Sequence, residues 1–169
     1  MRRVRGAGPL AALAALLALP AAAQDDADAA WTLYSQDPSA CYVSSPAGTS
    51  VNTRDGAEVN VSRGTTRLVL GWRPADGMNG QVSFTGGYPF DPERPVTLAA
   101  NGQTFEMTND GEWAYSASPE ADAAILAALR GGQSAVLTGL STRGTQTQDT
   151  FPLDGIGEAV DAALATCPG

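Results

Sequence analysis

The sequence predicts a mostly β fold: a two-layer β-sandwich or closed barrel of about eight strands, with one or two short helices covering an end. One observation behind this prediction is that apolar and polar residues alternate with a period of two over much of residues 58–115. Another is that clusters of Gly, Pro, Asn and Asp separate these runs, as turns do. Helical spacing of apolar residues occurs only toward the C-terminal end.

The first 23 residues have the pattern of a secretory signal peptide. Three arginines among the first five residues form a positive start, and an uninterrupted run of Ala and Leu follows over residues 10–19. Residues 21–23 are alanines, which suit a signal peptidase site. The apolar run is about half of the roughly 20 residues that a membrane-spanning helix needs, so an uncleaved anchor is the weaker alternative.

Residues 24–30 are acidic and rich in alanine, which predicts a flexible lead-in. A single β-rich domain is expected over residues 31–169, long enough to bury a core. The chain has 10 basic and 18 acidic residues, for a net charge of -8, and every basic residue is arginine. Because such a surface repels phosphate backbones, nucleic acid is not expected as a partner.

Cys41 and Cys167 are the two cysteines of the chain. In an exported protein an even pair most simply forms a disulfide, which here would tie the start of the domain to its last residues. On the chain-entropy model such a long loop contributes about 4–5 kcal/mol. Two free thiols are the alternative.

Three alternating runs predict strands over residues 58–62, 67–73 and 81–85, with Gly- and Pro-containing turns between them. Their apolar members are Val59 and Val61, then Leu68, Leu70 and Trp72, then Val82 and Phe84. We expect these side chains to face the core.

The dipeptide Asn101-Gly102 predicts a two-residue type I′ turn, because both central positions need positive φ. The hairpin places apolar residues on one face and polar residues on the other. The expected pairs are Leu98 with Phe105, Val96 with Met107, and Thr97 with Glu106. A further turn at residues 109–111 predicts another strand after it.

Two helices are expected late in the chain. Ser118 is a suitable N-cap with proline at the first helical position, and the glycines at 131–132 end this helix. Strands are expected through residues 135–137 and near 150–151. The last helix carries apolar residues at helical spacing up to Cys167.

Missing residue types exclude several catalytic chemistries. Without His or Lys there is no Ser-His-Asp triad, Cys-His pair or Schiff-base lysine. No metal site and no cofactor are expected, since two paired cysteines make no typical zinc site and no phosphate-binding glycine loop occurs. A carboxylate-dependent glycan hydrolase needs only two acids, such as Asp91 with Glu93 or Asp110 with Glu112. Because these acids stand beside Pro or Gly, solvated turn positions are favoured over catalysis or calcium binding.

Aromatic residues and arginines are the candidates for ligand binding. Trp72, Tyr88 and Trp113 could form a stacking platform for sugars, although Trp72 is in phase with core residues. Tyr88 stands in a Gly-Gly-Tyr-Pro-Phe segment whose tip could expose it. Arg54 and Arg143 neighbour loop residues and could clamp an anion, or form ion pairs that hold loops in place.

Several segments resemble the invasion-associated locus B family of bacterial exported proteins. They are residues 31–46 around Cys41, 50–56 (SVNTRDG), 80–90 (GQVSFTGGYPF), 110–114 (DGEWA), 138–155 (TGLSTRGTQTQDTFPLDG) and Cys167. The resemblance implies an envelope or secreted location, a compact β-rich fold and the terminal disulfide, and it transfers no catalytic residue. Pro152 departs from the family pattern, and because proline cannot donate to a ladder, the last strand should be an edge at that point.

The sequence therefore predicts a non-enzymatic, periplasmic or secreted protein that binds an unknown protein or envelope component. No integral membrane anchor is expected. One alternative is a carbohydrate-active or carbohydrate-binding protein that uses acidic residues and the Tyr88 loop. Another is a secreted protein that acts on host or neighbouring cells.

Overall fold

The computed structural model describes residues 31–35 and 39–168, so the expected signal peptide and lead-in lie outside the described residues. Within them are eleven strands, two α-helices and a short 3-10 helix, η1 (Pro74–Asp76). The strands are β1 (Thr32–Ser35), β2 (Cys41–Pro46), β3 (Thr49–Arg54), β4 (Ala57–Glu58), β5 (Arg67–Arg73), β6 (Met78–Thr85), β7 (Val96–Ala100), β8 (Gln103–Asp110), β9 (Trp113–Ser116), β10 (Ser134–Leu140) and β11 (Gln146–Pro152).

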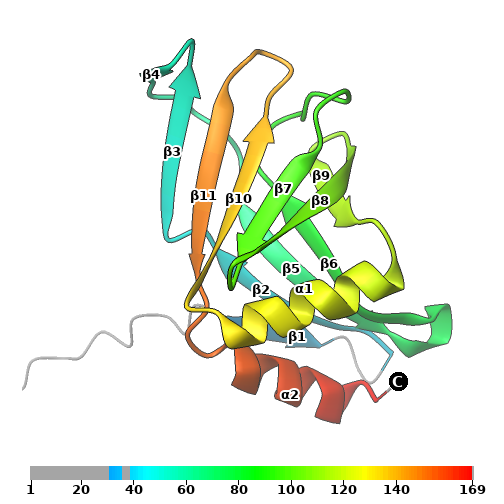
Figure 1. Ribbon diagram of the computed structural model, residues 1–169. Helices are drawn as coiled ribbons and strands as arrows, with labels where there is room; N and C mark the ends of the chain where they lie inside the picture. Colours follow the sequence, from blue (N-terminus) through cyan, green and yellow to red (C-terminus); the bar gives the residue numbers. More distant parts are fainter. Residues whose placement is uncertain (1–30, 36–38, 169) are drawn as a thin grey trace, which may run out of the picture.

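All strands belong to one antiparallel sheet in the order β1-β2-β5-β6-β9-β8-β7-β10-β11-β3-β4. The sheet folds over on itself, so that β3, β11, β10 and β7 stand in front of β2, β5 and β6 in Figure 1. Phe84 on β6 and Phe151 on β11 are separated by four strands in this order, yet their rings meet edge to face at 6.0 Å. The predicted mostly β fold with two helices is confirmed. The sheet has eleven strands rather than about eight, and its edges β1 and β4 do not close.

The core lies between the two layers of this folded sheet. Leu68, Leu70 and Trp72 on β5 are buried, as are Val82 and Phe84 on β6. The strands expected over residues 67–73 and 81–85 are therefore confirmed. Trp72 is a core residue and takes no part in a stacking platform.

The strand expected over residues 58–62 is wrong. Strand β4 ends at Glu58, and residues 59–66 form an irregular connection to β5, with Val61 exposed. The connection has to leave the free edge at β4 and reach the other layer, so it cannot continue to pair. Arg63 in this connection forms an ion pair with Asp149 on β11.

The hairpin at Asn101-Gly102 has the predicted register. Both turn residues have positive φ, 48° and 73°. The pairs between β7 and β8 include all three that were expected: Leu98 with Phe105, Val96 with Met107, and Thr97 with Glu106. The next turn connects β8 to β9, also as predicted.

Helix α1 (Pro119–Gly131) begins and ends where the sequence indicated. The Ser118 hydroxyl accepts a hydrogen bond from the Ala121 amide at 3.2 Å. In the next turn the buried Asp122 carboxylate accepts from the Val82 amide at 2.7 Å and from the Ser116 hydroxyl. Because the Asp122 carboxylate is nearly inaccessible to water, these hydrogen bonds compensate its desolvation and hold α1 against β6.

Helix α2 (Ile156–Thr166) packs against β1 and β2, and the disulfide fixes its end. Cys41 on β2 is joined to Cys167, with Cα atoms 6.0 Å apart and both side chains buried. The expected disulfide is thus present, rather than two free thiols. Neither α1 nor α2, the helices of the described chain, has the length and apolar character to cross a bilayer.

Pro152 occupies the end of β11. Pairing of β11 with β3 stops at Thr150, whereas pairing with β10 continues to Pro152. The predicted edge therefore exists locally, although β11 as a whole is an interior strand. The missing amide of Pro152 removes no ladder hydrogen bond on the β3 side.

We expect replacement of both cysteines by alanine to lower the free energy of unfolding by about 2–5 kcal/mol, because the cross-link restricts the unfolded chain. Urea unfolding followed by circular dichroism measures this change. Reduction of the unaltered protein should have the same effect, and a reductant should not affect the variant. An unchanged midpoint in both cases would contradict a stabilising role.

Candidate functional site

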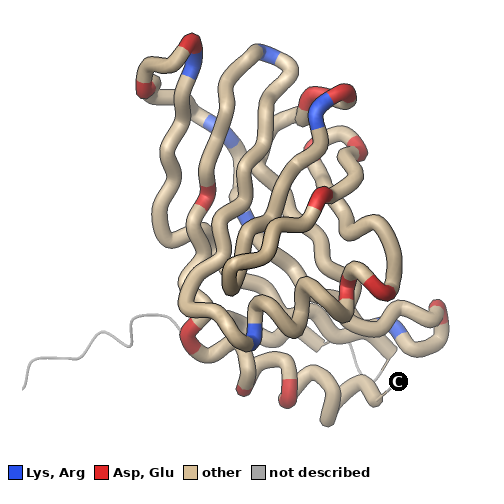
Figure 2. Tube along the Cα trace, viewed as in Figure 1, with Lys and Arg blue, Asp and Glu red and all other residues tan. Residues whose placement is uncertain are grey.

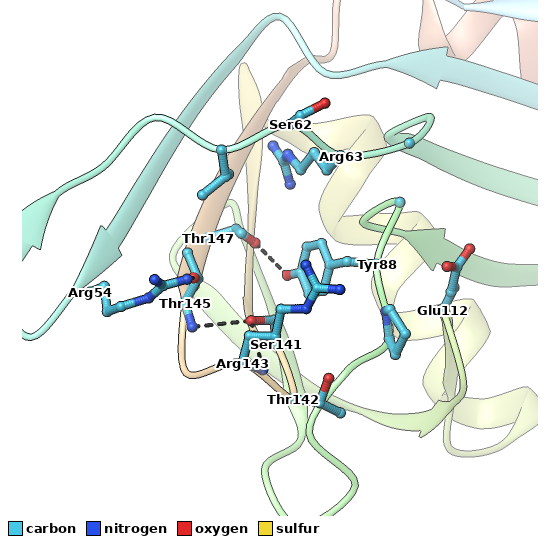
Figure 3. Close-up of a pocket in the computed structure, with 14 residues that line it drawn as sticks. Arg54, Ser62, Arg63, Tyr88, Glu112, Ser141, Thr142, Arg143, Thr145 and Thr147 are labelled. Atoms are coloured by element: carbon cyan, nitrogen blue, oxygen red, sulfur yellow. Dashed lines mark hydrogen bonds between the residues drawn. The ribbon is translucent and has the colours of Figure 1, made fainter.

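A pocket of about 410 Å³ opens beside the turn between β10 and β11 (Figure 3). Its wall comes from segments far apart in sequence: the end of β3, the connection 59–66, the loop 86–90, the turn 111–112 and residues 141–147. Arg54, Tyr88 and Arg143, the three residues predicted for binding, all line it. The fold thus brings the three candidates together, and their binding role remains a prediction.

One face of β11 points inward, and its side chains change from apolar to polar toward the pocket. Phe151 lies in the core and Asp149 is fully buried, whereas Thr147 and then Thr145 line the pocket. Because side chains on a strand alternate between faces, these four residues form one row on one face. The row connects the apolar core to a polar cavity.

A buried ion pair lies at the base of this row. Asp149 has no exposed surface, and Arg63 donates two hydrogen bonds to its carboxylate, one of them at 2.9 Å. The Ser50 hydroxyl donates a third at 2.6 Å. The hydrogen bond to Asp149 raises the pKa of Arg63 above its usual value. The pair fastens the connection 59–66 to β11.

Sequence reasoning missed both members of this pair. The available signal was the position of Asp149 in phase with Phe151 on a predicted strand, since a buried carboxylate needs a cation or several hydrogen bonds. Nothing in the sequence identified Arg63 as that cation. Its segment was expected to be a strand and turn.

Tyr88 is held between the two layers by contacts on several sides. Its hydroxyl forms a 2.6 Å hydrogen bond with Thr147, its ring meets Phe90 edge to face at 4.9 Å, and the Arg63 guanidinium lies 6.0 Å from its centre. Burial raises the pKa of Tyr88 to about 12. The phenol is therefore neutral at physiological pH, and it is ordered before any ligand arrives.

Glycines provide the space for this arrangement. A β-carbon at Gly139 would lie 2.8 Å from the Tyr88 hydroxyl oxygen and from the Phe90 ring. Gly87 has φ of 72°, and a β-carbon there would lie 2.4 Å from the backbone of Gly64. The two backbones approach closely enough for the Gly64 amide to donate to the Gly87 carbonyl at 2.9 Å.

Arg54 and Arg143 differ from Arg63 in lacking a carboxylate partner among the described residues. Arg54 donates to the Thr145 hydroxyl at 2.6 Å, and the Arg143 guanidinium makes no hydrogen bond or ion pair within the described chain. The alternative that these two arginines form ion pairs to fix loops is therefore not what this structure contains. Both are exposed at the pocket.

Acidic residues are spread over the whole molecule, whereas several of the basic positions lie near the upper end of the view, in the turns after β3 and β10 (Figure 2). Glu112 is the acidic residue among those that line the pocket. Asp91 accepts a hydrogen bond from the Glu93 amide at 2.9 Å, as expected of a turn residue. No group of three or more His, Cys, Asp or Glu side chains suited to a metal lies within the described ranges.

The three aromatic residues considered for a sugar-stacking platform do not lie together, and the core position favoured for Trp72 is confirmed. Trp72 is buried in the core and Tyr88 lines the pocket, whereas Trp113 lies outside the pocket on β9 and stacks on Tyr115 at 6.4 Å. The period-two pattern of β9 directs Trp113 away from the core, so the three rings cannot share one surface.

We expect Arg63→Met to lower the free energy of unfolding by about 3–5 kcal/mol, because it leaves the buried Asp149 without a cation. The exposed pair Arg130–Asp161 supplies a control, and Arg130→Met should cost less than about 1 kcal/mol. Combining Arg63→Met with Asp149→Leu should recover much of the loss. Chemical unfolding of the four proteins measures these differences, and equal effects of the two single changes would contradict the assignment.

An alkaline titration tests the environment of Tyr88. The difference in phenolate absorbance between the unaltered protein and Tyr88→Phe should have a midpoint near pH 12, against about 10 for a free tyrosine. Since the folded state keeps the proton that the unfolded state releases, this group's contribution to stability is complete below about pH 10 and is lost as pH rises through its folded pKa. A difference midpoint at the ordinary value would show that Tyr88 is solvated.

The comparisons with known proteins concern the family and the fold. A model of the invasion-associated locus B (IalB) family matches residues 99–164. None of the curated proteins matches the chain. Among solved structures, invasion associated protein B from Bartonella henselae resembles this chain with a TM-score of 0.52 and 16% sequence identity, over 80% of this chain and 92% of that one. The family match confirms the predicted resemblance to the invasion-associated locus B family over residues 99–164.

Proposed function

We propose that the protein is an exported, non-catalytic binding module of the invasion-associated locus B type, whose pocket holds a small anionic ligand on Arg54 and Arg143. The observation that supports this proposal best is that two arginines, neither paired with a carboxylate of the described chain, line one cavity. Guanidinium groups bind carboxylates and other oxyanions through planar, charge-assisted hydrogen bonds.

The charge distribution favours an anion at this place. The described residues include seven arginines, and three of them line the pocket of a protein with net charge -8. Arg63 is neutralised by Asp149, so its charge is already compensated. Arg54 and Arg143 outnumber Glu112, and the pocket keeps a local positive charge.

The turn that carries Arg143 is well ordered by its own hydrogen bonds. The Ser141 amide donates to the Thr145 carbonyl at 2.8 Å, and the Ser141 hydroxyl accepts from the Thr145 amide at 3.0 Å. Arg54 comes from another wall of the pocket, and its hydrogen bond to the Thr145 hydroxyl fixes its orientation. A ligand would therefore meet a backbone that is already arranged, which reduces the entropy lost on binding.

Export is supported by the signal-like residues 1–23 and by the Cys41–Cys167 disulfide, which suits an oxidising compartment. The periplasm and the exterior are both compatible with these features. A binding role rather than catalysis is supported by the lack of His and Lys in the sequence. It is also supported by the pocket wall, where Glu112 is the one acid among the described residues, because glycan hydrolysis ordinarily needs two carboxylates.

The proposal predicts that sulfate, used as a probe anion at constant ionic strength, binds at Arg54 and Arg143. In ¹⁵N spectra of the arginine side chains, the Nε resonances of these two residues should shift saturably. Arg54→Gln combined with Arg143→Gln should abolish the response. Arg94, which has no ion pair with the described residues and lies outside the pocket, is the control, and Arg94→Gln should change nothing. Equal, non-saturating shifts at all arginines would mean that the pocket binds no anion.

A further inference from the structure

The shape of the pocket and its polar side chains, as well as its positive charge, restrict the ligands that can fit. We infer that its ligand is an acidic sugar, a pyranose unit whose carboxylate lies on Arg54 and Arg143 and whose hydroxyls meet the serine, threonine and Glu112 side chains. This inference rests on the proposed anion site and specifies the class of ligand. Three observations support it: unused hydroxyl groups, the position of Glu112, and the composition and size of the wall.

Hydroxyl groups line the pocket with hydrogen-bonding capacity to spare. Thr142 and Ser62 form no side-chain hydrogen bond within the described chain, and both line the pocket. The Ser141 oxygen accepts from two backbone amides, at 3.0 and 3.3 Å, which leaves its own O–H free to donate. Groups that both donate and accept suit the hydroxyls of a sugar better than a bare oxyanion, which can only accept.

Glu112 gives the pocket two ends of opposite charge. In Figure 3 it lies across the cavity from Arg54, with Tyr88 between them. Its turn is fastened to the loop 86–90, because the Phe90 amide donates to the Gly111 carbonyl at 2.9 Å. A carboxylate at this end repels a compact multivalent anion such as phosphate. It accepts hydrogen bonds from ligand hydroxyls, so a ligand with one anionic end and one neutral, donor-rich end fits both.

The remaining wall and the size of the cavity suit one or two sugar units. Pro89 and the accessible part of Tyr88 supply the apolar surface on which the C–H face of a pyranose can rest. The volume of about 410 Å³ is near the lower end of the usual range for small-molecule sites, about 300–1,000 Å³. An amino acid would also have an anionic end, with its ammonium group on Glu112, and the experiment below distinguishes it.

Calorimetric titrations of the full mature chain at constant ionic strength test the inference. The ligands are methyl glucuronide, the neutral methyl glucoside with equivalent ring hydroxyls, acetate as a carboxylate without them, and glycine. We expect the glucuronide to bind about tenfold more tightly than the glucoside and than acetate. Charged hydrogen bonds contribute about that factor, and so do two or more hydroxyl contacts together. Arg54→Gln combined with Arg143→Gln should reduce glucuronide binding to the level of the glucoside.

Glu112→Gln separates the two ends of the pocket. It should weaken glucuronide binding by a factor of about three or more and leave acetate binding unchanged or stronger. Arg94→Gln is the matched control and should leave every affinity unchanged. Circular dichroism spectra of the variants should be identical to that of the unaltered protein, since the replaced side chains are all exposed. They are Arg54, Arg94, Glu112 and Arg143.

The outcomes are distinguishable. If acetate or sulfate binds as tightly as the glucuronide, the anion site stands and the sugar assignment is overturned. If glycine binds more tightly than the glucuronide, the ligand is of the amino-acid class and the inference is wrong. If neither sulfate nor any of the four ligands binds, the proposed anion site itself fails.

Discussion

The buried pair between Arg63 and Asp149 is the interaction on which the arrangement of the two layers depends at the pocket end. One partner lies on the irregular connection that leaves β4, and the other lies on an interior strand of the opposite part of the sheet. Because the Asp149 carboxylate is removed from water, losing its cation is far more costly than losing a partner of a surface pair. The connection that the pair fixes also places Gly64 against Gly87, and so fixes the loop that holds Tyr88.

Much of the fold could be predicted because it follows from local rules. The Asn101-Gly102 turn determines its own hairpin register through positive φ, and Ser118 determines the start of α1 through its cap. The irregular segment 59–66 could not be predicted in this way. Its alternation of valines resembles a strand, but the segment crosses from the edge at β4 to the other layer. There Arg63 pairs with a residue 86 positions away, which local patterns do not reveal. The number of strands and the open edges depend on how the layers meet, which period-two patterns do not encode.

The candidate site was predictable by residue type and not by geometry. Tyr88, Arg54 and Arg143 stood out because an aromatic in a glycine loop and arginines in an acidic chain are unusual, and they do share one pocket. Glu112 was expected to be a solvated turn residue beside Asp110, rather than a catalytic or calcium-binding acid. The turn is present, but it also places Glu112 on the pocket wall opposite Arg54. Its position follows from the way the β8–β9 turn meets the loop after β6. Such loop-to-loop contacts are set by the sheet order, not by the local sequence.

The residues that line the pocket come from both the earlier and the later part of the chain, which matters when relatives are compared. The family match covers residues 99–164 and therefore includes Glu112 and the turn of Arg143, but it leaves out Arg54, Arg63 and Tyr88. Two proteins that match the family model over this region can share one wall of the cavity. They can still differ in the facing wall, which comes from an earlier part of the sequence. The family match therefore covers one wall of the cavity, and the residues of the facing wall have to be compared separately in each relative.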